Sequence, residues 1–118
     1  MRDSWEKIDS YLKAKGFSVG TPDPKQTIQG HHASKHGHLS SHYLGLARDY
    51  GIHDSDANGI ARHLEFIATL PCGPIAELYF APLGIWYKNG QKVLDGPLVI
   101  GGHQDHCHVA LHPGRWLL

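Results

Sequence analysis

The sequence has little of three features that would each indicate a class of protein: long apolar runs, excess charge of one sign, and cysteine. No apolar run approaches the ~18 residues of a membrane-spanning helix, so we expect no membrane span. Eleven Lys and Arg residues balance eleven Asp and Glu residues, which leaves no strong field to attract nucleic acid or an anionic membrane. The two cysteines, Cys72 and Cys107, do not show from spacing alone whether they pair.

The length and composition are those of one globular unit. A chain of 118 residues is long enough for one hydrophobic core and too short for two, so we expect a single domain over residues 1–118. Its hydrophobic content of 41% and charged content of 19% are ordinary for a globular protein. The segment Met1–Lys7 is charged and amphipathic, unlike a signal peptide, so we expect no self-directed export.

Histidine is what the chain has in excess, with 11 in 118 residues. Three of them, His103, His106 and His108, stand within six positions and lead into an apolar run. Because residues two apart on a strand share a face, we expect His106 and His108 on one face and Cys107 and Val109 on the other. Two imidazoles on one rigid face suit a metal ion, alone or beside a catalytic group. Metal affinity should then fall in acid, as imidazoles protonate below about pH 6.5.

A second motif, residues 40–49 with the sequence SSHYLGLARD, precedes the His-x-His element. The pattern Ser-x-His-x-x-Gly-x-Ala-x-Asp followed by His-x-His resembles the signature of zinc D-Ala-D-Ala metallopeptidases and their murein endopeptidase relatives. That superfamily includes lysostaphin-type enzymes and the hedgehog signalling domain. The final element, His-x-x-His-x-His before Val-Ala-Leu, is most similar to penicillin-insensitive murein endopeptidases and to peptidase domains of phage lysins and tail proteins. The resemblance covers residues 30–111.

The resemblance implies one catalytic zinc ion held by His42, Asp49 and His108. Catalytic zinc commonly takes three protein ligands and leaves the fourth position to water, whose pKa it lowers towards neutrality. The residues themselves are compatible with this set if Asp49 lies on a short strand, on the same face as Ala47, and faces a neighbouring strand that bears His108.

A group that handles protons must lie beside the activated water, and two neighbours fit this role. His106 shares the face of His108 and matches a histidine of the murein endopeptidases. Asp105 has the spacing of the acidic base in the dipeptidases and carboxypeptidase-like endolysins of the superfamily. His103 matches a further histidine that could stabilise the oxyanion or hold substrate, or it is a loop residue at the rim. Ser40 is expected to hydrogen-bond behind the ligands, since no base beside it would make it a nucleophile.

The expected function is therefore zinc-dependent hydrolysis of peptide bonds in the stem or cross-link peptides of peptidoglycan, as a D-Ala-type endopeptidase or carboxypeptidase. Such a protein would reach the cell wall after release or by phage-mediated delivery, and could act alone or as part of a larger phage or tail assembly. The alternative is a catalytically inactive, zinc-containing binding module of hedgehog type. A purely structural zinc site would need a fourth ligand, for which Cys107 is the nearest candidate.

The chain pattern predicts an α+β domain with an antiparallel sheet and two main helices. The resemblance implies the same architecture, a small central antiparallel sheet with the zinc site on it. The helices are expected at residues 4–15, capped by Ser4, and at 57–70, capped by Asp54, Ser55 or Asp56. A long loop is expected over residues 20–37. Strands are expected at residues 46–50, 74–80, 84–87, 91–94 and 106–111, with a hairpin turn at Asn89-Gly90.

Overall fold

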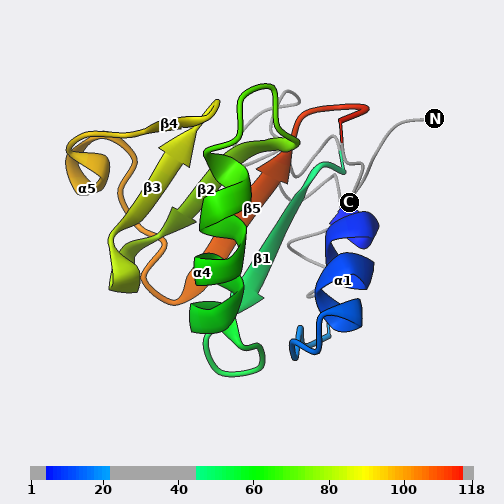
Figure 1. Ribbon diagram of the computed structural model, residues 1–118. Coiled ribbons are helices and arrows are strands. Elements are labelled where there is room, and N and C mark those ends of the chain that lie inside the picture. The colour runs from blue at the N-terminus through cyan, green and yellow to red at the C-terminus, as the bar shows by residue number, and fades with distance from the viewer. Residues whose placement is uncertain (1–4, 22–44, 116–118) are drawn as a thin grey trace.

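The computed structural model describes residues 5–21 and 45–115. The helix elements are α1 (Trp5–Ala14), α4 (Ala57–Ala68), the 3-10 turn η1 (Ala81–Leu83) and α5 (Gly96–Val99). The strands are β1 (Ala47–Gly51), β2 (Ile75–Phe80), β3 (Ile85–Lys88), β4 (Gln91–Lys92) and β5 (His106–Leu111). They form one antiparallel sheet in the order β1-β5-β2-β3-β4 (Figure 1). The predicted α+β class and antiparallel sheet are confirmed.

Some sequence predictions concern residues that the structure does not describe. These are the helix cap Ser4, the motif residues Ser40 and His42, and all but the start of the loop predicted over residues 20–37.

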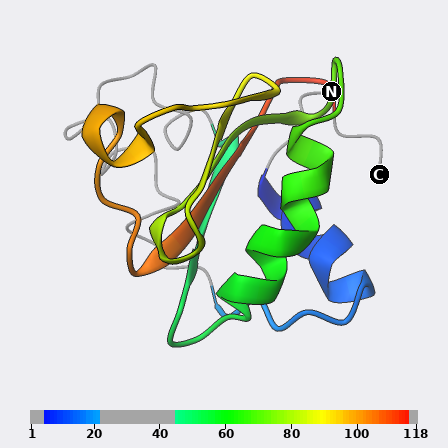
Figure 2. The same cartoon turned by 60° about the vertical axis from the view of Figure 1, so that its left-hand side comes forward.

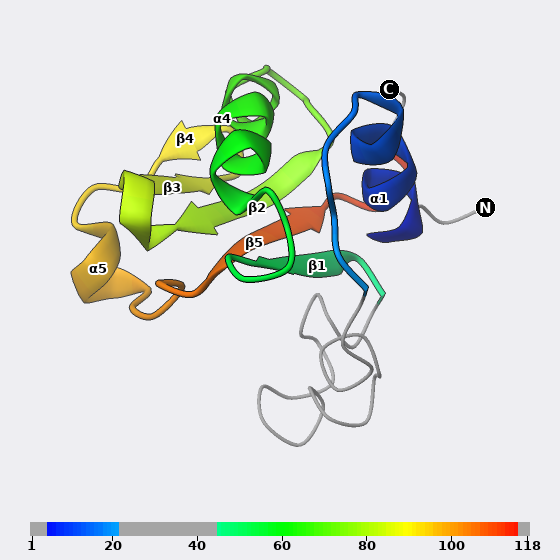
Figure 3. The ribbon, with the colours of Figure 1, turned by 90° about the horizontal axis from the view of Figure 1, so that it is seen from below.

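Helices α1 and α4 lie on the same face of the sheet and enclose the core with it (Figure 3). Helix α1 reaches this core through Ile8 and Leu12, and α4 through Ile60, Leu64 and Ile67. Asp56 caps α4, since its side chain accepts a hydrogen bond from the N–H of Gly59. The short helix α5 lies towards the other face (Figure 2).

Alternation along β5 divides its side chains as predicted. Cys107 and Val109 are fully buried in the core beneath the helices, and His108 projects from the opposite face. The register pairs Asp49 of β1 with His108, and His108 with Tyr79 of β2. Asp49 therefore lies on the face of His108, as expected from the sequence. We call this side of the sheet the histidine face.

Within residues 81–99 the structure differs from the sequence prediction in three details. Strand β4 covers only Gln91–Lys92 instead of residues 91–94, and the helical turns α5 and η1 were not predicted. Helix α5 is a single turn that begins after Asp95, whose φ of 58° lies in the left-handed region. One turn has no periodic pattern that a sequence can reveal.

A buried ion pair ties α1 to β1 from the core side of the sheet. The guanidinium of Arg48 donates from Nε to Oδ1 of Asp9 at 3.0 Å, and the hydroxyl of Tyr50 donates to the same oxygen at 2.6 Å. Burial, followed by the hydrogen bond to Asp9, raises the pKa of Tyr50 above its usual range. Arg48 also donates to the carbonyl of Asp49 at 2.5 Å. The network therefore fixes the backbone of β1 directly behind the Asp49 carboxylate.

Replacing Asp9 with alanine is expected to lower the free energy of unfolding by about 3–5 kcal/mol, because the charge of Arg48 would remain buried without its partner. Urea unfolding followed by circular dichroism measures this change. Ser10→Ala, on the exposed side of the same helix, is the control and should change stability by no more than about 0.5 kcal/mol. A loss below about 1 kcal/mol for Asp9→Ala would show that the network does not hold α1 to the sheet.

Candidate active site

Asp49 and His108 meet on the histidine face where β1 and β5 pair. Only 6% of Asp49 and 7% of His108 is exposed, and Oδ1 of Asp49 lies 3.0 Å from Nδ1 of His108. Two ligands of a tetrahedral zinc ion, each bonded at about 2.0–2.2 Å, lie about 3.4 Å apart. The two atoms therefore need to move by only a few tenths of an ångström to share an ion. These two predicted ligands fit a zinc site in position and in donor chemistry.

A second carboxylate, which the sequence analysis did not single out, holds the other nitrogen of His108. Oε1 of Glu77, on β2, lies 2.9 Å from Nε2 of His108. The ring of Tyr79 stacks on the imidazole with centroids 5.3 Å apart and planes 16° apart. The hydrogen bond with His108 is the main cause that lowers the pKa of Glu77. His108 is therefore fixed at both ring nitrogens and on one ring face.

The two carboxylates also change the protonation of His108. Burial lowers the pKa of the imidazole, but the hydrogen bonds and negative charges of Asp49 and Glu77 outweigh it and raise that pKa to about 9. A proton then lies between Nδ1 and the Asp49 carboxylate at neutral pH. A cation bound between the same two atoms must displace that proton.

His106 and Asp105, which the sequence left as alternative bases, form a pair. Nδ1 of His106 lies 2.7 Å from Oδ1 of Asp105, and since a carboxylate only accepts, the imidazole N–H donates. The hydrogen bond with His106 is the main cause that lowers the pKa of Asp105, which stays ionised. The Asp105 side chain is 80% exposed and that of His106 only 25%. Nε2 is the ring nitrogen of His106 that this bond leaves for proton transfer.

His103 completes the cluster from the loop before β5. Its ring centroid lies 5.1 Å from that of His106 and 5.4 Å from that of His108. Gly101, Gly102 and His103 all have left-handed backbones, with φ of 71°, 66° and 63°. For a histidine this conformation is uncommon, and its side chain stabilises it by bonding the carbonyl of Gly101 at 2.8 Å. Burial and the positive charge on His108 lower the pKa of His103, so it is neutral at neutral pH.

The structure thus brings five of the seven predicted site residues to one region: Asp49, His103, Asp105, His106 and His108. Within residues 5–21 and 45–115, no three His, Cys, Asp or Glu side chains converge as a complete metal site. Asp49 and Glu77 cannot both bind one metal ion together with His108, because they bond different nitrogens of its ring.

Cys107 lies on the wrong face for the fourth ligand of a structural zinc site. It is fully buried in the core, opposite the histidine face, and burial raises its thiol pKa. Cys72 and Cys107 are both free. The alternative of a closed structural site through Cys107 is therefore contradicted.

The aromatic residues near the site belong mainly to the framework. Trp86 is only 5% exposed and lies in the row Asp49, His108, Tyr79, Trp86 across four strands. The backbone of Gly96, at the start of α5, lies so close to its indole that a Cβ there would come within 2.3 Å. Trp86 therefore supports the far end of the histidine face by packing.

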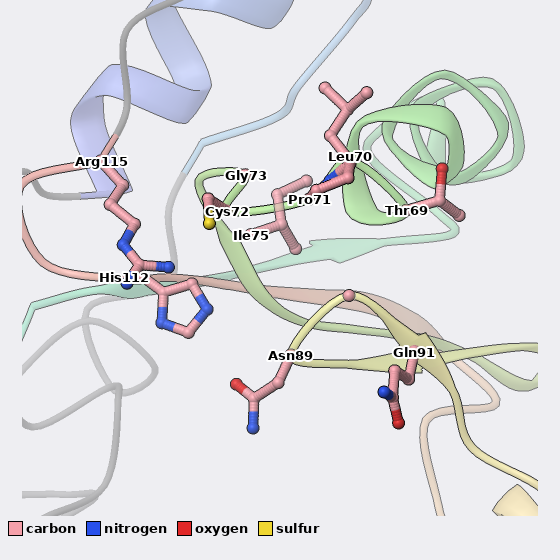
Figure 4. Close-up of a pocket in the computed structure, with 11 residues that line it drawn as sticks. Thr69, Leu70, Pro71, Cys72, Gly73, Ile75, Asn89, Gln91, His112 and Arg115 are labelled. Atoms are coloured by element: carbon pink, nitrogen blue, oxygen red, sulfur yellow. The ribbon is translucent and has the colours of Figure 1, made fainter.

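A pocket of about 250 Å³ opens elsewhere, between the end of α4, the β3–β4 turn and the chain after β5 (Figure 4). Cys72, Asn89, His112 and Arg115 are among the residues that line it. None of the predicted site residues does, so this pocket is separate from the histidine cluster.

Comparisons with protein-family models, with curated proteins and with solved structures find no match to this chain. Among the helices that the structure describes, none is both long and apolar enough to cross a membrane.

Proposed function

We propose that the protein is a zinc-dependent peptidase that hydrolyses peptide bonds in the stem or cross-link peptides of peptidoglycan. The observation that carries the proposal is the pairing of Asp49 with His108 across two strands, at 3.0 Å, beside the hydrogen-bonded Asp105–His106 pair. A ligand pair and an oriented acid–base pair on one sheet face are the two parts that a hydrolytic metal site needs.

The roles of the residues follow from their contacts. Asp49 and Nδ1 of His108 would hold the ion, with His42 as the third ligand that the sequence motif implies. A zinc ion bound there would polarise the scissile carbonyl and lower the pKa of a water molecule. Asp105 accepts a hydrogen bond from Nδ1–H of His106, which would leave Nε2 to take a proton from the attacking water and return it to the leaving amine.

His103 would complete the site as a hydrogen-bond acceptor that holds the peptide. It is neutral, bonded through Nδ1 to the carbonyl of Gly101, and placed against both His106 and His108. Its Nε2 atom is therefore left for the substrate. Because Nδ1 carries the proton donated to Gly101, Nε2 of the neutral ring can accept a hydrogen bond from an N–H of the peptide, whereas stabilising the oxyanion would require a second proton on the ring.

The choice of peptidoglycan as the substrate rests on the resemblance of the two sequence motifs to the D-Ala-D-Ala and murein peptidases. The alternative is a zinc-containing binding module of hedgehog type without catalysis. The Asp105–His106 hydrogen bond favours catalysis, because a module that only binds has no need of an oriented base.

The experiment is the release of peptides from purified peptidoglycan by the wild-type chain, the chelated chain, and the chelated chain after zinc is restored. We expect soluble fragments with the first and third preparations and none with the second. The fragment masses identify the bond. One tightly bound zinc ion with no release, from peptidoglycan or from small D-amino-acid peptides, would instead support the binding module.

A further inference from the structure

A β-bulge in β2 brings Glu77 to the histidine face. Ile75 pairs with Leu111, whereas Glu77 pairs with Ala110, so two steps along β2 match one step along β5 and Ala76 is the extra residue. Regular alternation would put Glu77 on the same face as Ile75, which is in the core. The bulge reverses this, and β-bulges are frequent where a side chain must be redirected next to a site.

The redirected carboxylate of Glu77 forms a hydrogen bond with His108, one of the predicted metal ligands. Its Oε1 is 2.9 Å from Nε2 of His108, and its side chain is 24% exposed. Lys88 faces it from the paired position of β3. Because the two imidazole nitrogens point in different directions, a bond at Nε2 turns Nδ1 towards Asp49.

We propose that Glu77 is the positioning residue for His108: it accepts the Nε2–H hydrogen bond and thereby directs Nδ1 at a metal ion shared with Asp49. The inference rests on the proposed zinc site. Carboxylates that accept the free N–H of a metal-bound histidine fix its tautomer and its ring orientation, and they make it a more basic ligand. Glu77 itself is not a ligand in this arrangement.

The test is the zinc affinity of the full chain, measured by competition with a chromophoric chelator, for two substitutions of similar size. Glu77→Met removes the acceptor and should weaken zinc binding by about 10–100-fold. Glu77→Gln keeps an acceptor oxygen and should remain within about fivefold of wild type. Glu65→Met is the matched control: Glu65 is 29% exposed, accepts from Tyr87 and reaches the sheet from α4, so affinity should stay within about twofold.

A second measurement separates positioning from packing. In nitrogen-15 NMR spectra of the metal-free chain, the Nε2–H proton of His108 should be protected in wild type and in Glu77→Gln, and exchange rapidly in Glu77→Met. If the Met variant binds zinc like wild type, or the Gln variant is as weak as the Met variant, the positioning role is overturned. If Glu77→Met abolishes binding as completely as Asp49→Asn, Glu77 is a ligand, and the proposal is again wrong.

These outcomes are distinct from failure of the proposed function. A chain that binds zinc with the expected variant pattern but releases no peptide is no peptidase, and the role of Glu77 stands. If the wild-type chain binds no zinc, both the proposed function and the positioning role of Glu77 are wrong. If Glu77→Met binds zinc and releases peptide like wild type, only the positioning role of Glu77 is wrong.

Discussion

Asp49→Asn is expected to lower zinc affinity by about 10³-fold or more and to abolish peptide release. The substitution keeps the size of a side chain that is nearly buried, but it replaces an anionic ligand with a neutral amide next to Nδ1 of His108. The loss should exceed the 10–100-fold effect that is typical of groups that only orient a ligand. Competition with a chelator gives the affinity, and fragment release from peptidoglycan gives the activity.

The control for this prediction is Asp54→Ala, which removes an exposed carboxylate beyond the end of β1. Its zinc affinity and activity should equal those of wild type. The melting temperature of metal-free Asp49→Asn separates loss of a ligand from loss of the fold, since the amide oxygen can still accept from His108. An Asn variant that folds and binds zinc within tenfold of wild type would exclude Asp49 as a ligand.

His106→Ala is expected to lower kcat by about 10²–10⁴-fold while zinc affinity stays within about threefold. The expected loss is large because Nε2 of His106 is the proton-transfer atom that the Asp105 bond leaves available. His53→Ala, an exposed histidine in the turn after β1, is the matched control and should leave kcat unchanged. Turnover of a small D-amino-acid peptide by the zinc-loaded proteins gives kcat without the complication of an insoluble substrate.

The same assay distinguishes the two residues of the pair. Asp105 is mostly exposed, so water can replace part of its effect on the imidazole, and Asp105→Asn should lower kcat by about tenfold. A larger loss for Asp105→Asn than for His106→Ala would reverse the roles and make Asp105 the base.

The placement of Asp49 and His108 could be predicted because strand side chains alternate with a period of two. Cys107 and Val109 are apolar and must enter the core, so His108 has to emerge on the other face. The same alternation puts Asp49 on the face of Ala47 and apart from Arg48 and Tyr50, which bond Asp9 on the core side in the structure. The ligand set that the resemblance implies requires their strands to be neighbours, and the register shows that they are.

Glu77 could not be predicted, because its orientation depends on an irregularity. With regular alternation through Ala76, Glu77 would share the core face of Ile75, and a sequence pattern does not reveal where a bulge lies. The Asp105–His106 contact has a similar origin. It joins a strand residue to the residue just before the strand, where alternation no longer constrains the direction of a side chain.

Anomalous diffraction at the zinc absorption edge, from crystals grown with zinc, would show whether Asp49 and His108 share a metal ion. We expect one strong peak within about 2.0–2.2 Å of both a carboxylate oxygen of Asp49 and Nδ1 of His108, with His42 as a third ligand. A zinc ion that binds Nε2 of His108 instead, or that lies between His103 and His106 without contacting Asp49, would contradict the proposed site.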